Sequence, residues 1–224
     1  MCIRDRTAQD YQWEIVVADD GSIDHTTRLV GLKIAAYPNI RVLHLPHRGK
    51  GWAVKNGMLA AKGEYRVISD ADLSVPIEQV DRLLPPLGPE SDIVLGSRET
   101  PSASRIGEPS GRHFMGRAFN KLVGLLVMPG LADTQCGFKA FQTKVIQHIY
   151  EESRLYRNEA THLRGPSVTA FDVELLFRAY KSKYKIMEIP IDWYHEPQSK
   201  VNWFKDSIVM AMDGIKIRWY HATG

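Results

Sequence analysis

The feature that most constrains the fold is the segment at residues 64–72, which reads EYRVISDAD. Val67 and Ile68 belong to a short run of β-forming residues after Gly63, and the run ends in two carboxylates, Asp70 and Asp72. A run of this kind between two helical patterns predicts a buried parallel strand. Ligands of open α/β sheets bind outside the carboxyl ends of the strands. The segment therefore predicts an α/β fold with a polar site at the end of this strand.

The two carboxylates favour a cation site. Acids one residue apart at a strand end repel each other, and Mg²⁺ or Mn²⁺ held by carboxylate and phosphate oxygens relieves the repulsion. The alternative is a cap, in which Asp72 accepts a hydrogen bond in the turn before Pro76 and the helix expected over residues 77–87. The residues alone leave both interpretations open.

The neighbouring segments repeat the order of strand and helix, which predicts a doubly wound, Rossmann-like and mostly parallel sheet flanked by helices. Strands are expected at residues 14–18, 40–45 and 92–96, and helices at residues 24–37 and 52–61. The second half carries helical patterns at residues 112–127, 144–150, 171–181 and 203–219, and strand patterns at residues 138–141 and 185–192. Three polar stretches predict mobile loops or insertions: residues 100–111, 151–168 and 196–200.

Composition narrows the class of protein. The 224 residues are 44% apolar and 25% charged, as in an ordinary globular protein, and the net charge of +3 is too small to argue for a nucleic-acid partner. The two cysteines form no metal-ligand spacing. No apolar run approaches the ~20 residues of a membrane span. We expect one domain over residues 11–224, with a nucleotide half to about residue 99, an acceptor half from residue 100, and a non-native or disordered start at residues 1–10.

Six motifs occur in a specific order: DDGSIDHT (19–26), GKGWAVKNGMLAAKGEY (49–65), SDADLSVP (69–76), GSRE (96–99), DTQCGFKAF (133–141) and FDVELL (171–176). In this order they resemble family-2 inverting glycosyltransferases of the GT-A fold. The resemblance is strongest to the dolichyl-phosphate or polyprenyl-phosphate β-glucosyltransferases, with the mannosyltransferases next. It implies transfer of a hexose from a nucleotide sugar to a lipid phosphate at the cytoplasmic face of a membrane, with glucose and UDP-glucose favoured.

The resemblance also implies site residues. Asp70 and Asp72 match the metal-binding acids, and Arg98 and Arg112 match arginines near the donor phosphates. The expected substrate-binding residues are Asp19, Asp20, Gly21, Ser22, Lys50, Asp70, Ala71, Arg98, Arg112, Ser199 and Lys200. The expected catalytic residues are Asp70, Asp72, Asp133 and Arg98. For Asp133 and Asp172 a turn cap and a helix N-terminal charge are the alternatives to a site role.

Two departures from the family pattern bear on activity. The family opens with a strand that ends in Pro-x-Tyr/Phe-Asn-Glu, and nothing before Glu14 matches it, so we expect a missing first strand, weak nucleotide binding and marginal stability. Ser74 stands where some mannosyl relatives carry a glutamine that helps the metal. The open alternatives are a GDP-mannose-dependent mannosyltransferase, a transferase with a polysaccharide acceptor, and an inactive nucleotide-sugar-binding remnant. The helix at residues 203–219 is expected either at the membrane surface or packed on the sheet, and the oligomeric state is left open.

Overall fold

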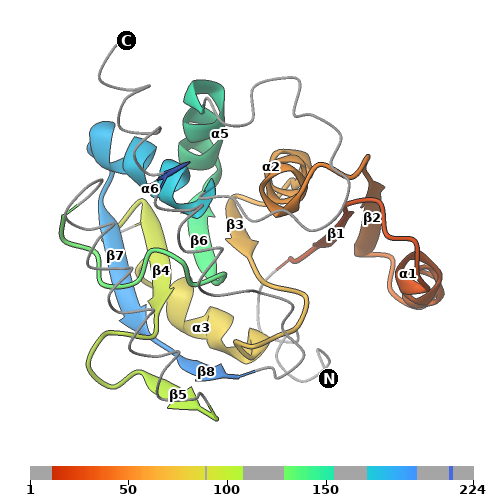
Figure 1. The fold of residues 1–224 in the computed structure, drawn as a ribbon, viewed down its shortest axis with the longest axis horizontal. Helices are drawn as coiled ribbons and strands as arrows, with labels where there is room; N and C mark the ends of the chain where they lie inside the picture. Colours follow the sequence, from red (N-terminus) through yellow and green to blue (C-terminus); the bar gives the residue numbers. More distant parts are fainter. Residues whose placement is uncertain (1–11, 89, 108–128, 154–170, 196–211, 214–224) are drawn as a thin grey trace.

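The computed structural model describes residues 12–88, 90–107, 129–153, 171–195 and 212–213 (Figure 1). Strands and helices alternate through the first half, as the sequence predicts. The strands are β1 (Ile15–Asp19), β2 (Ile40–His44), β3 (Tyr65–Ile68), β4 (Ile93–Ser97), β5 (Ser104–Ile106), β6 (Lys139–Gln142), β7 (Ile186–Pro190) and β8 (Asp192–Tyr194). The helices are α1 (Thr26–Ile34), α2 (Lys50–Ala60), the 3₁₀ turn Ile77–Gln79, α3 (Val80–Leu83), α5 (Thr143–Glu152) and α6 (Phe171–Lys181).

The strands form three sheets, of which the largest has the order β3-β6-β4-β7. Strand β4 is parallel to β7, whereas β6 lies between β3 and β4 and is antiparallel to both. Strands β1 and β2 form a separate parallel pair, and β5 pairs in parallel with β8. Parallel pairing therefore predominates, and β6 is the exception that reverses one strand in the middle of the sheet.

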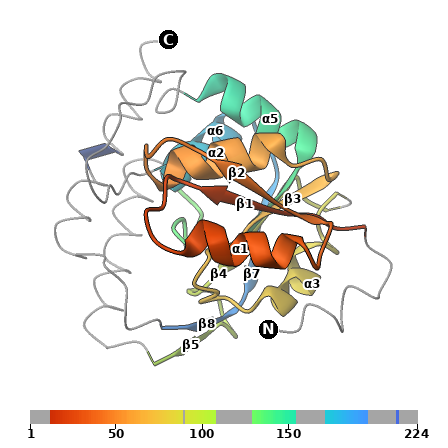
Figure 2. The same ribbon diagram turned by 90° about the vertical axis from the view of Figure 1, so that its right-hand side faces the viewer.

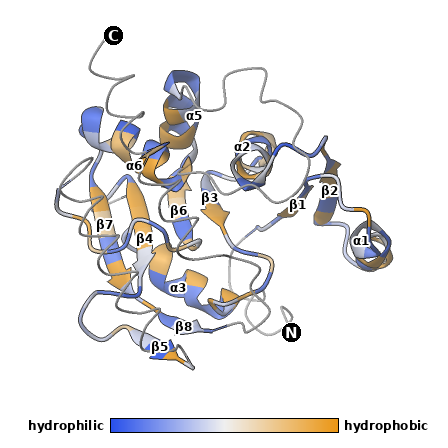
Figure 3. Cartoon of the chain, in the orientation of Figure 1, coloured by the Kyte–Doolittle hydropathy of each residue, from blue (hydrophilic) through white to orange (hydrophobic). Residues whose placement is uncertain are grey.

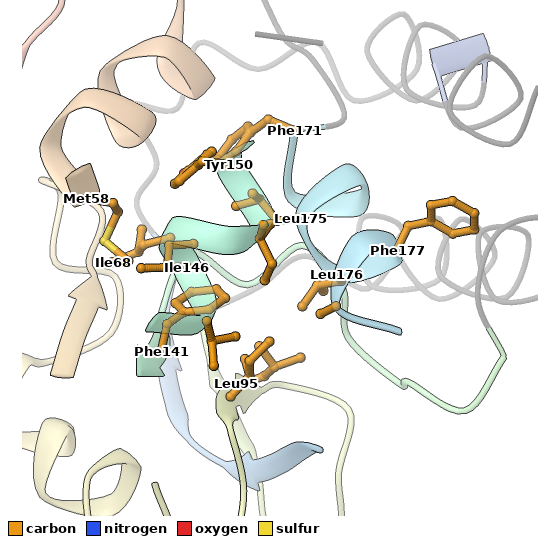
Figure 4. Packing of buried hydrophobic residues seen from close by; sticks show 14 of the residues in the cluster. Met58, Ile68, Leu95, Phe141, Ile146, Tyr150, Phe171, Leu175, Leu176 and Phe177 are labelled. Atoms are coloured by element: carbon orange, nitrogen blue, oxygen red, sulfur yellow. The ribbon is translucent and has the colours of Figure 1, made fainter. Parts of the chain in front are cut away.

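Side chains that alternate along the strands fill two cores, one on each face of the four-stranded sheet. Ile93 and Leu95 of β4, with Phe141 of β6, pack against α5 and α6, whereas Val94 and Ala140 face the segment that contains α3. Figure 4 shows Ile68, Ile146 and Phe141 close together, with Leu95, Leu175 and Leu176 beside them. Apolar residues accordingly concentrate in β4, β6 and β7 (Figure 3). The strand-end loops extend from this well-packed sheet.

The β1–β2 pair is covered differently. It lies between α2, which packs on β1, and α1 beside β2 (Figure 2). Among the described residues of these two strands, Asp19 is the one that is fully buried, and the others are half-buried or exposed. The pair is thus a thin layer beside the main sheet.

Three expectations need correction. Strand β3 was expected in parallel pairing, but the partner that the structure shows is β6, which runs antiparallel to it. The helix expected over residues 77–87 ends at Leu83, because Pro85 and Pro86 have no backbone N–H to donate to the carbonyls of Asp81 and Arg82. The stretch 100–111 was expected to be a loop, but Ser104–Ile106 forms β5 because β8 offers it a backbone partner.

Several expectations lie outside the described residues: the start at residues 1–10, the helices at residues 112–127 and 203–219, the loop at residues 196–200 and nearly all of the insertion at residues 151–168. The division into two halves and the missing first strand stay predictions. Within the described part of the chain, the structure contains no helix with the length and apolar character of a membrane span.

Candidate functional site

Two acidic side chains at the end of β1, Asp19 and Asp20, accept hydrogen bonds from the neighbouring loops. The carboxylate of Asp20 accepts hydrogen bonds from the backbone N–H groups of Arg48 and Gly49, both at 2.8 Å, and lies 2.7 Å from Nδ1 of His47. Gly49 has a φ of 94° and caps α2, so this contact fixes the start of that helix. Asp20, predicted to hold the nucleotide, is therefore the anchor of residues 47–51 (HRGKG), which we call the basic loop.

Asp19 has a similar role inside its own turn. Its buried carboxylate accepts a hydrogen bond from the backbone N–H of Ser22 at 3.1 Å and lies 3.6 Å from Nδ1 of His44. Gly21, which lies between Asp19 and Ser22 in the sequence, has a φ of 78°, and a Cβ there would lie 3.2 Å from the backbone nitrogen of His47. The predicted residues 19–22 thus form one tight turn that packs against the basic loop.

The basic loop places Lys50 on the acids that follow β3. The Lys50 ammonium lies 2.7 Å from Oδ1 of Asp70, and the Lys50 side chain is half exposed. Partial burial disfavours the charged form of Lys50, but the carboxylates of Asp70, Asp172 and Asp72 outweigh it and raise the pKa of Lys50. The structure therefore joins Lys50 and Asp70, two of the predicted site residues, in one ion pair with further acids nearby.

Asp70 and Asp72 have the donor atoms that a divalent cation needs. Carboxylate oxygens suit Mg²⁺ and Mn²⁺, which use one or two protein carboxylates and take their other ligands from water and substrate phosphates. Oδ1 of Asp72 accepts the backbone N–H of Ser74 at 3.0 Å, so the expected hydrogen bond in the turn before Pro76 exists and engages one of the two carboxylate oxygens. Asp72 does not cap the helical segment, because that segment begins after Pro76 without a side-chain cap. The described residues contain no group of three or more His, Cys, Asp or Glu able to hold a metal. Asp70 and Asp72 would therefore supply two ligands of such a cation, and water or phosphate oxygens would supply the others.

Arg98 and Asp133 form a second, deeper ion pair. Nε and Nη2 of Arg98 donate to the two carboxylate oxygens of Asp133 at 2.6 and 2.8 Å, and the Asp133 side chain has no exposed surface. Burial raises the pKa of Asp133, but the guanidinium of Arg98 outweighs it and holds the pKa well below its usual value. Glu188 fixes the same loop by accepting the backbone N–H groups of Ala132 and Asp133, both at 2.8 Å. Asp133 therefore orients Arg98 and is poorly suited to accept a proton.

Sequence reasoning missed Lys139. This lysine of β6 is completely buried, and its ammonium lies 2.6 Å from Oδ1 of Asp172. A buried lysine is rare unless it is paired, so a lysine inside the apolar run GFKAF was the signal that an acid must face it. Asp172, for which the sequence left a site role open, also contributes to the field at Lys50. Asp172 thus pairs with Lys139 and also favours the charged form of Lys50.

The remaining predicted residues are less well placed. Ala71 and Asp72 are exposed beside Asp70. Arg112, Ser199 and Lys200 lie outside the described residues. The structure therefore brings together Lys50 with Asp70, Arg98 with Asp133, and Asp19 with Ser22.

Comparison with known sequences identifies relatives over most of the chain. The family described as "Glycosyl transferase family 2" matches residues 2–150. The chain is 34% identical over 223 residues to a dolichyl-phosphate beta-glucosyltransferase of Dictyostelium discoideum, covering 96% of this chain and 65% of that protein. It is 32% identical to the Saccharomyces cerevisiae protein of that name (95% and 66% covered) and 31% identical to the human one (96% and 66% covered). The chain spans just under two thirds of the length of these relatives.

Solved structures show the same fold at lower identity. Glucosyl-3-phosphoglycerate synthase from Mycobacterium tuberculosis matches with a TM-score of 0.57 and 15% identity, covering 91% of this chain and 68% of that one. Mannosyl-3-phosphoglycerate synthase from Rubrobacter xylanophilus matches with a TM-score of 0.55 and 13% identity, covering 94% and 64%. The M. tuberculosis enzyme has also been solved in complex with Mn²⁺ and UDP. The expected α/β fold of the GT-A glycosyltransferases is thereby confirmed.

Proposed function

This chain belongs to glycosyl transferase family 2, and from that premise we propose that it transfers glucose from UDP-glucose to a dolichyl or polyprenyl phosphate. The observation that carries the proposal is the alignment of 95–96% of the chain with proteins named dolichyl-phosphate beta-glucosyltransferase from three organisms. Because the acceptor is a lipid phosphate, we also propose that the protein works at a membrane surface, on the cytoplasmic face.

The proposed reaction needs neutralisation of the charge on the departing diphosphate more than it needs a strong base. In an inverting transfer, an acceptor phosphate oxygen attacks the anomeric carbon while the bond to the nucleoside diphosphate breaks. The acceptor phosphate is already anionic at pH 7, so a depressed pKa at Asp133 is compatible with the reaction. Asp133 then serves by holding Arg98, whose guanidinium is kept in place for a phosphate.

Asp70 and Asp72 are the residues that would hold Mg²⁺ or Mn²⁺. When bound, the cation would offset charge on the departing diphosphate. Lys50 supplies a fixed positive charge beside the same carboxylates, since its ammonium lies 2.7 Å from Asp70. The solved M. tuberculosis complex with Mn²⁺ and UDP supports a metal of this kind.

The test is a transfer assay with purified protein, dolichyl phosphate in detergent, Mn²⁺ and a panel of nucleotide sugars. We expect the lipid product with UDP-glucose and its loss on adding EDTA. Asp72→Asn should lose nearly all transfer, whereas Asp81→Asn, which alters an exposed acid of α3, should keep it.

Three outcomes would change the assignment. Transfer from GDP-mannose alone would identify a mannosyltransferase. Transfer only to a polysaccharide would remove the lipid acceptor, and binding of UDP-glucose without transfer to any acceptor would indicate an inactive remnant.

A further inference from the structure

The carboxylate of Asp70 lies directly against the backbone of Gly137. A Cβ built on Gly137 would be 2.2 Å from Oδ2, 2.4 Å from Cγ and 2.7 Å from Oδ1 of Asp70. All three of the nearest atoms belong to that one carboxylate, and all three distances are shorter than any normal contact. Asp70 therefore occupies the space that a side chain at position 137 would fill.

The strand register explains why these two residues meet. Strand β6 is antiparallel to β3, and Ile68 is paired with Lys139. Continuing this register for two residues places Gly137 opposite Asp70, and opposed residues of an antiparallel pair have their side chains on the same face. The residues just before the reversed strand β6 therefore lie at the carboxyl end of β3.

A side chain at position 137 would displace the carboxylate and leave the backbone in place. The flanking residues Cys136 and Phe138 are both 1% exposed, and the carbonyl of Phe138 accepts the N–H of Gly96 at 2.9 Å. The Asp70 side chain, in contrast, is 35% exposed. Gly137 is also not among the glycines with a positive φ, so alanine meets no backbone strain there.

We propose that Gly137 is a positioning residue for Asp70. Because Gly137 has no side chain, the carboxylate of Asp70 can lie against the backbone there, where it pairs with Lys50 and is placed for the metal. The inference rests on the proposed metal role of Asp70. It gives the glycine of the DTQCGFK motif a part in donor binding. Neither the order of the motifs nor the chemistry of a glycine predicts that part.

The test compares Gly137→Ala with Asp70→Asn and with the control Gly31→Ala. Gly31 lies in α1, and a Cβ there would meet nothing within 4 Å. Mn²⁺ is titrated into each protein in the presence of UDP, and free Mn²⁺ is followed by its electron paramagnetic resonance signal. We expect Gly137→Ala to weaken the apparent Mn²⁺ affinity by about 10- to 100-fold, the range found when residues that orient metal ligands are changed. Gly31→Ala should bind as the unchanged protein does.

Steady-state kinetics add a second measurement. A displaced carboxylate can still be drawn back by the cation, so in Gly137→Ala the KM for Mn²⁺ should rise while kcat at saturating Mn²⁺ recovers. Asp70→Asn lacks the charged ligand and should not recover. A fall in kcat with unchanged KM for Mn²⁺ would contradict the positioning role.

Stability measurements keep the inference testable if Gly137→Ala folds poorly. Should its Tm fall, the double variant with Asp70→Ala removes the carboxylate and should restore the Tm, since the three atoms nearest to the added Cβ all belong to Asp70. A Tm that is not restored would overturn the inference. Normal Mn²⁺ binding by Gly137→Ala with weak binding by Asp70→Asn would overturn it and leave the proposed function standing. Normal binding by Asp70→Asn would overturn both the metal role and the inference.

Discussion

The two parts of the molecule that carry the site are stabilised in different ways. All five residues of β4 are buried, and seven of the eleven residues of α6 are buried. In the described structure, none of the nine residues of α1 is buried, and Leu29 and Leu32 of that helix are exposed. The four-stranded sheet is therefore held by apolar packing, whereas the β1–β2 unit has little of it.

What the β1–β2 unit has instead is carboxylates bound to backbone. Asp19 and Asp20 accept N–H groups from two loops, and Glu14 accepts the N–H of Lys62 and pairs with Arg41. The hydrogen bonds of Glu14 outweigh the opposing effect of its partial burial and lower its pKa. The contrast teaches that the acids of the β1–β2 unit are part of its structure, so that changing them alters its folding.

The largest effect should come from the acid that is buried in the well-packed part. Asp133→Ala leaves the guanidinium of Arg98 without its partner in a site where that side chain is only 18% exposed. Removing one partner of a buried ion pair costs about 3–5 kcal/mol, so the free energy of unfolding should fall by that amount. Urea denaturation at pH 7 measures it. Asp20→Ala, in the β1–β2 unit, is the matched change, and an equal loss for both variants would contradict the comparison.

The next prediction compares two isoleucines, each the first residue of its strand. Ile93 of β4 is completely buried, whereas Ile15 of β1 is half-buried. Ile93→Ala should cost about 2–5 kcal/mol because it leaves a cavity in a packed core. Ile15→Ala should cost about 1 kcal/mol, since less surface leaves water when this residue folds. Denaturation curves of the two variants test the difference directly, and similar midpoints would show that the β1–β2 unit is packed as tightly as the main sheet.

Local sequence patterns predicted several of these elements and one residue of the candidate site. The strands at 15–19, 40–44 and 93–97 follow from local apolar runs, Asp70 follows from its position at a strand end, and Arg98 follows from the family resemblance. The helix at Phe171–Lys181 was predicted with its bounds because its apolar residues recur with a helical period. Local patterns are enough wherever one segment determines its own structure.

Partners that are distant along the chain could not be predicted in this way. Arg98 meets Asp133 across 35 residues, and Lys139 meets Asp172 across 33. Both contacts depend on β6 entering the sheet antiparallel to β3 and β4, and a four-residue strand carries no signal for its direction. The contact of Gly137 with Asp70 has the same origin, so it appears only once the register is known.

A smaller effect concerns acid pH. The pKa of Asp133 is lower in the folded protein than its usual value of about 3.9 in an unfolded chain. A depressed folded-state pKa stabilises the protein above the unfolded pKa, and this stabilisation is lost as the pH falls toward the folded value. The difference in unfolding free energy between the unchanged protein and Asp133→Asn should therefore be constant above about pH 5 and shrink below about pH 4. Denaturation at several pH values checks this, and a difference that grows on acidification would reverse the assigned sign.

The smallest effect should be local to the β1–β2 side of the site. Asp20→Asn replaces a carboxylate that accepts the N–H groups of Arg48 and Gly49 by an amide with a single acceptor oxygen. A hydrogen bond to a charged group contributes about 1.5–3 kcal/mol, so losing one should speed amide exchange at residues 48 and 49 by about 10-fold or more. Amides of β4 should exchange as before. Leu95 of β4 is fully buried, and the partners of Asp20 in the described structure lie in the basic loop and not in the main sheet. Hydrogen exchange followed by NMR resolves both regions in one experiment. If the amides of β4 accelerated together with residues 48 and 49, the two parts would unfold as one unit, and the basic loop would owe its order to the main sheet and not to Asp20.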